Sequence, residues 1–73
     1  MRMFVIMKGD EAMARHQCAK RGILINEIEV LPTEVRFQSP LLDRPKIVDW
    51  YCEDAGFAKL VQPGELLWYT VKE

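Results

Sequence analysis

The sequence predicts a small α+β domain in which a mainly antiparallel sheet carries one main helix on one face. An unbroken apolar run, Met3–Met7, has the length and the β-branched and aromatic content of a buried strand. A helix-forming segment follows it at once, and later segments alternate apolar and polar residues with the period of strands. The expected order is therefore strand, helix, strand, strand, helix, strand, within one compact domain spanning residues 1–73.

The first helix is expected over Ala12–Arg21. Asp10 precedes it and can accept a hydrogen bond from the free amides of the first turn, and Gly22 is expected to end it. Its small apolar residues lie on two different sides, Ala12 and Ala19 on one, Ala14 and Cys18 on the other. The sequence therefore leaves open which side packs against the sheet.

The next two strands are expected to form an antiparallel hairpin. Residues 25–30 and 34–38 both alternate, and the intervening Leu31-Pro32-Thr33 is typical of a turn. The alternation places four charged residues together on the water-facing side, namely Glu27, Glu29, Glu34 and Arg36.

The second half of the chain is less regular. Two prolines, Pro40 and Pro45, favour a surface loop over residues 39–45. A short second helix is expected from Pro45, with Gly56 as its cap, and residues 57–61 are expected to return as a loop or short extended segment. Residues 66–71, rich in Trp, Tyr, Thr and Val, predict the last strand.

Composition excludes several classes of function. The chain of 73 residues has a formal net charge of -1, so it lacks the positive potential that drives binding to phosphate backbones. No apolar run approaches the roughly 20 residues needed to cross a bilayer. We therefore expect a soluble, cytoplasmic protein with no membrane partner. The two cysteines, Cys18 and Cys52, are expected to be reduced and buried.

The sequence predicts neither an enzyme nor a metal or cofactor site. His16 and Cys18 point to different helix faces, and Cys52 adds no recognisable zinc spacing. The single histidine has no nucleophile placed beside it by spacing. Solvent-exposed helix faces explain both the remaining carboxylate cluster, Asp49, Glu53 and Asp54, and the basic cluster, Arg15, Lys20 and Arg21.

The aromatic residues of the second half carry more information. Five large rings fall within twenty residues, and a small domain does not easily bury them all beside four leucines. Exposed apolar groups mark protein contacts, and Trp, Tyr and Arg supply most of the energy at interfaces. The predicted partner-binding residues are Leu41, Leu42, Arg44, Trp50, Tyr51, Trp68 and Arg36. The alternative, that the same rings complete the core, stays open for each residue.

Three stretches resemble small single-domain proteins of tailed bacteriophages. They are the opening residues 3–11 (MFVIMKGDE), residues 49–53 (DWYCE) and residues 63–69 (PGELLWY). In length and layout the chain is similar to the phage-encoded transcription regulators that bind the RNA polymerase of the bacterial host. That resemblance implies binding near the amino end of the largest polymerase subunit and the β-flap. It also implies sigma-factor displacement, inhibition of initiation and antitermination, in the cytoplasm of the host. It carries over no individual functional residue.

Two other functions remain alternatives. One is a small phage antagonist of a host defence complex, of the anti-CRISPR or anti-restriction type. The other is a small nucleic-acid-binding module that uses Arg15, Lys20 and Arg21, although the glutamates of the hairpin disfavour direct contact with nucleic acid. The protein is expected to act as a monomer.

Overall fold

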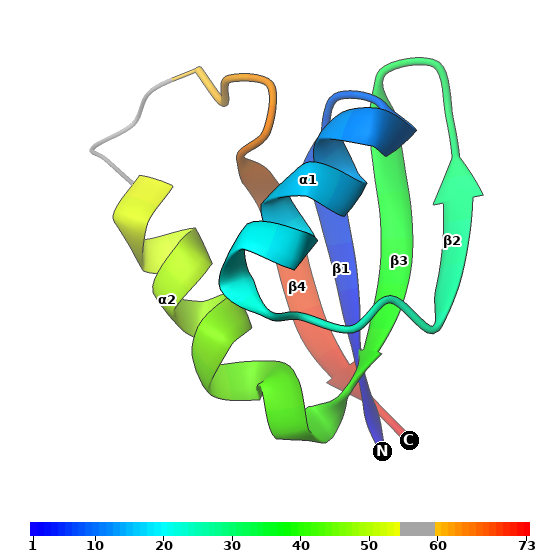
Figure 1. Ribbon diagram of the computed structural model, residues 1–73, viewed down its shortest axis with the longest axis vertical. Coiled ribbons are helices and arrows are strands. Elements are labelled where there is room, and N and C mark those ends of the chain that lie inside the picture. The colour runs from blue at the N-terminus through cyan, green and yellow to red at the C-terminus, as the bar shows by residue number, and fades with distance from the viewer. Residues whose placement is uncertain (55–59) are drawn as a thin grey trace.

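The computed structural model describes residues 1–54 and 60–73, and it confirms the predicted α+β class (Figure 1). Residues 55–59, which include the predicted cap Gly56 and the ring of Phe57, lie outside the described part. The elements are β1 (Arg2–Lys8), α1 (Glu11–Arg21), β2 (Glu27–Val30), β3 (Glu34–Pro40), the 3-10 helix η1 (Leu41–Asp43), α2 (Arg44–Asp54) and β4 (Leu66–Lys72).

The four strands form one antiparallel sheet in the order β2-β3-β1-β4. The central strands β1 and β3 pair along their whole length, from Arg2 opposite Pro40 to Lys8 opposite Glu34. The order of elements along the chain together with this strand order defines the ferredoxin-like, split βαβ arrangement. Figure 1 shows both helices on the same side of the sheet, which leaves the other face uncovered by either helix.

The core lies between the sheet and the two helices. Side chains from β1 and β3 alternate between this core and the opposite face, as half-buried strands require. Trp50 of α2 stacks on Phe37 of β3 with ring centroids 6.4 Å apart, and the guanidinium of Arg21 on α1 lies 4.6 Å from the centre of the Trp50 ring. The fully or almost fully buried apolar residues are Met3, Val5, Met7, Ala14, Cys18, Ile23, Val35, Phe37, Ile47, Trp50 and Leu66.

The ends of α1 follow the sequence. The side chain of Asp10 accepts a hydrogen bond from the Met13 amide at 2.9 Å, and Gly22 ends the helix with a left-handed backbone (φ 71°). The side bearing Ala14 and Cys18 packs against the sheet, whereas Ala12 and Ala19 are exposed. The structure thus decides between the two faces that the sequence left open.

The prediction of an irregular loop over residues 39–45 is wrong. Pro40 is the last residue of β3, with an extended backbone (φ -63°, ψ 150°) that suits a proline ring. Pro45 is the second residue of α2, where its missing amide proton costs no helical hydrogen bond. The predicted second helix is confirmed: it begins at Arg44, one residue before the expected start, and has 11 residues, as α1 does.

Two buried polar side chains explain why this stretch is ordered. The hydroxyl of Ser39 donates a hydrogen bond to the carbonyl of Leu24, and the carboxylate of Asp43 accepts one from the Leu24 amide at 2.9 Å. Lys46 Nζ lies 3.6 Å from Asp43 Oδ1 and donates to the carbonyl of Gly22 at 2.8 Å. These hydrogen bonds therefore hold the segment after α1 against the end of β3 and the start of α2.

Candidate protein-binding face

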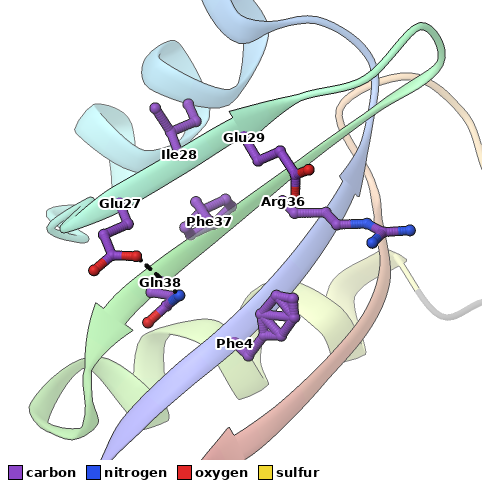
Figure 2. A pocket seen from close by; sticks show the side chains of 7 residues that line it. All are labelled: Phe4, Glu27, Ile28, Glu29, Arg36, Phe37 and Gln38. Atoms are coloured by element: carbon purple, nitrogen blue, oxygen red, sulfur yellow. Dashed lines mark hydrogen bonds between the residues drawn. The ribbon is translucent and has the colours of Figure 1, made fainter.

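The candidate site is the sheet face that lies opposite the helices, and we call it the open face. It is formed by the residues of β1 and β3 that alternate away from the core, together with the residues of β2 and β4 beside them. Among the side chains that Figure 2 draws, Phe4, Glu27, Glu29, Arg36 and Gln38 belong to this face. The open face consists of Arg2, Phe4, Ile6, Lys8, Glu27, Glu29, Glu34, Arg36, Gln38, Pro40, Trp68, Thr70 and Lys72.

Aromatic rings occupy the part of the open face over β1 and β4. Phe4 and Trp68 meet edge to face, with centroids 6.4 Å apart and an interplanar angle of 82°. The ammonium of Lys72 lies 4.4 Å from the centre of the Phe4 ring, a cation-π contact. Trp68 remains 50% exposed despite this contact, which is unusual for so large an apolar side chain. The pair therefore presents apolar surface to the solvent.

The part of the open face over β2 and β3 is charged and hollowed. A shallow hollow of about 130 Å³ lies there (Figure 2). The guanidinium of Arg36 donates to Glu34 at 2.8 Å, and Arg2 lies 3.7 Å from Glu27. The hydrogen bond to Glu34 raises the pKa of Arg36. The residues that line the hollow are Phe4, Glu27, Ile28, Glu29, Arg36, Phe37 and Gln38.

The structure brings two of the predicted partner-binding residues together. Arg36 and Trp68 are both register partners of Ile6, one on each side of β1. They thus form one row across the open face, a cation at one end and an indole at the other. This arrangement of Arg and Trp around an apolar centre is typical of the residues that dominate protein interfaces.

The other predicted anchors lie elsewhere. Leu42 and Arg44 are exposed at the junction of η1 and α2, and Leu42 is the more prominent because 86% of its surface is accessible. Leu41 is half-buried and packs against the core. This junction lies at the end of the molecule where both chain termini also lie (Figure 1).

The predicted anchor Trp50 requires a correction, because the structure buries it completely. Its ring fills the space between Phe37 and Arg21 and is not available to a partner. Tyr51 is half-buried and meets Tyr69 edge to face at 5.1 Å, on the helix side of the sheet. In the Trp50-Tyr51 pair, the tryptophan therefore belongs to the core.

Sequence reasoning missed Phe4, Ile6 and Lys72. The run Met3–Met7 was interpreted as a strand buried on both faces, and such a strand gives no alternation by which to single out Phe4 and Ile6. The sequence does contain one indication of their orientation, because Arg2 precedes Phe4 by two residues and Lys8 follows Ile6 by two residues. Polar residues in phase with Phe4 and Ile6 indicate the solvent-facing side of the strand.

Within residues 1–54 and 60–73, no group of three or more His, Cys, Asp or Glu side chains is placed to hold an ion. Cys18 is buried, and burial raises the pKa of its thiol to about 11. Cys52 is exposed, so the expectation that both thiols are buried is wrong for this residue. Both cysteines are free.

The fold and this face define a class: a ferredoxin-like domain whose uncovered sheet surface carries exposed aromatic and basic side chains. Comparison with protein-family models, with curated proteins and with solved structures finds no match for the chain. In the described part of the chain, neither helix has the length and apolar character needed to span a bilayer.

Proposed function

We propose that the protein is a non-enzymatic bacteriophage regulator that binds the RNA polymerase of the bacterial host and inhibits transcription initiation. The observation that carries a binding function is the row Arg36, Ile6 and Trp68 beside Phe4. It combines a half-exposed indole, an apolar centre and a guanidinium of fixed charge on one uncovered sheet face.

A protein partner suits the chemistry of this face. Apolar and aromatic groups at its centre gain by being removed from water, and the charged groups around them fix the orientation of a partner. Arg2 and Lys72 lie toward one end of the face, whereas Glu27 and Glu29 line the β2 edge. A partner surface with an apolar centre and the opposite arrangement of charge would be recognised.

The choice of RNA polymerase rests on the resemblance to phage transcription regulators. It implies contact with the amino end of the largest subunit and with the β-flap. A protein bound there would displace the sigma factor and would also allow read-through of terminators. Such an inhibitor requires surface complementarity and no chemistry of its own.

The first test is capture of polymerase from a bacterial lysate by the tagged protein. We expect the wild-type protein to retain the largest subunit and the β subunit, identified by mass spectrometry. The Trp68→Ala variant is expected to retain neither subunit. The matched control, Leu24→Ala, is expected to retain both. Leu24 is also a large exposed side chain, but it lies in the connection between α1 and β2.

Order of addition in a transcription assay then separates inhibition from non-specific effects. Protein added before sigma factor joins the core enzyme should abolish promoter-dependent transcripts. Protein added to elongating complexes should leave elongation intact and raise read-through at a terminator. Capture of a nuclease or restriction complex without polymerase subunits would assign the protein to the antagonists of host defence.

One observation favours a second candidate, the binding of single-stranded nucleic acid. Phe4 lies on a central strand of a ferredoxin-like sheet, and Trp68 stands beside it, as aromatic residues do in sheets that stack bases. Three glutamates on the same face, Glu27, Glu29 and Glu34, oppose the approach of phosphates. A fluorescence-anisotropy titration with single-stranded oligonucleotides at low salt distinguishes nucleic-acid binding from polymerase binding. The polymerase proposal expects no binding.

A further inference from the structure

The two edge strands of the sheet, β2 and β4, differ in length and in charge. The proposed polymerase contact does not depend on this difference. The β2 edge is only four residues long and carries Glu27 and Glu29, which discourage pairing with another strand. The β4 edge is seven residues long, contains no proline, and has Lys72 as its single charged residue. Among the described residues, no strand pairs with the outer side of β4.

The side chains of β4 are also unusually exposed. Trp68 is half exposed, and Leu67 and Val71 each expose over a third of their surface. A shift of register with β1 occurs between Ile6 and Met7, next to Leu67, so the regularly paired part of the strand is Trp68–Lys72. Long apolar edges of this kind are protected in most natural proteins or are used for strand pairing.

The sequence of this regular part is complementary to itself when it is paired antiparallel about Thr70. In that register Thr70 faces Thr70 of the second chain, a pair that can form a hydrogen bond. Tyr69 faces Val71, which is a favourable aromatic and β-branched pair. Trp68 faces Lys72, and this lysine already lies against an aromatic ring, that of Phe4, in the single chain.

We propose that β4 pairs antiparallel with β4 of a second copy of this chain, centred on Thr70. Every residue in the paired segment then finds a favourable partner, and no like charges face each other. Two four-stranded sheets join into one continuous sheet, and the two open faces become one surface. The contact is short and falls below the size of a standard interface, so the dimer is weak and depends on concentration, with a dissociation constant on the order of 0.1 mM.

Cysteine trapping tests the register directly. All variants carry Cys52→Ser, because the exposed Cys52 would otherwise form disulfides of its own. Opposed residues on paired strands have Cβ atoms about 4.5–5.5 Å apart, close to the separation that a disulfide needs. Thr70→Cys is therefore expected to form a covalent dimer on mild oxidation. Leu67→Cys is the matched control, because Leu67 is also exposed on β4 but lies outside the paired segment and does not face its own counterpart.

Sedimentation velocity of the Cys52→Ser protein, without added cysteines, measures the association of the two chains independently of the cysteine trapping. We expect reversible dimerisation over the submillimolar range, and we expect Thr70→Lys to abolish it by placing two like charges opposite each other. A protein that stays monomeric throughout that range overturns the proposal. Equal cross-linking of Thr70→Cys and Leu67→Cys would overturn the register. Neither result bears on polymerase capture, which is measured at much lower protein concentration.

Discussion

Phe4 and Trp68 meet edge to face on the side of the sheet opposite the helices, with centroids 6.4 Å apart. The two residues belong to neighbouring strands β1 and β4, so their contact also links the first and last strands of the chain. The contact orients the Trp68 indole while leaving half of its surface exposed. A side chain that is held in place before binding loses less conformational entropy when a partner covers it.

The Phe4-Trp68 contact is expected to contribute to stability beyond the burial of each ring. A double-mutant cycle with Phe4→Ala, Trp68→Ala and the double variant should give a coupling energy of about 0.5–1.5 kcal/mol in urea unfolding. Additive losses would show that the two rings are merely adjacent. Ile6→Ala combined with Trp68→Ala provides a comparison on the same face.

Trp50→Ala is expected to destabilise the protein strongly. The ring is fully buried between Phe37 and Arg21, and its loss should lower the free energy of unfolding by about 3–5 kcal/mol. Trp50→Phe should cost less, because the ring nitrogen of Trp50 is buried and finds no hydrogen-bond partner among the described residues. Urea unfolding checks both variants, and a loss below 1 kcal/mol for Trp50→Ala would contradict this assignment.

Asp43→Ala should release the segment that follows α1. The carboxylate accepts a hydrogen bond from the Leu24 amide at 2.9 Å, and its removal leaves this part-buried amide without that partner. We expect a loss of about 1–3 kcal/mol in thermal or urea unfolding. Asp43→Asn keeps an oxygen acceptor and should lose less. Equal losses in the two variants would indicate that the charge, and not the hydrogen bond, matters.

The two thiols should react at very different rates. The exposed Cys52 should react rapidly with a thiol reagent in the native protein, whereas Cys18 should react only after unfolding. Burial raises the pKa of Cys18 from 9.0 to about 11, so its neutral form contributes stability below pH 9 that is lost as the pH rises toward 11. The unfolding free energy of Cys18→Ala relative to wild type should show this change over that window. A constant difference would contradict the raised pKa.

The sequence predicted the elements well wherever local signals agreed with the final packing. Asp10 and Gly22 mark the ends of α1 because capping depends on neighbouring residues alone. Residues 39–45 were misread because two prolines favour a loop locally. The hydrogen bonds that Ser39 and Asp43 make to Leu24, 15 and 19 residues away along the chain, instead keep the stretch ordered.

The site was predicted only in part, for a related reason. Arg36 and Trp68 could be named from residue type, but their common neighbour Ile6 follows only from the strand order β3-β1-β4. The burial of Trp50 likewise depends on how α2 packs against Phe37, which periodicity did not resolve. Composition indicated surplus aromatic surface, and tertiary structure determined which face carries it.

The most direct test of the account is the affinity of the purified protein for purified bacterial RNA polymerase. Immobilised wild-type protein should bind the polymerase, and the Trp68→Ala substitution should raise the Kd of this complex by about tenfold or more. Leu24→Ala should bind as wild type does, and Leu42→Ala reports whether the η1-α2 junction adds to the contact. Absence of binding by the wild type, or equal affinity of wild type and Trp68→Ala, would contradict the proposal that the open face engages polymerase.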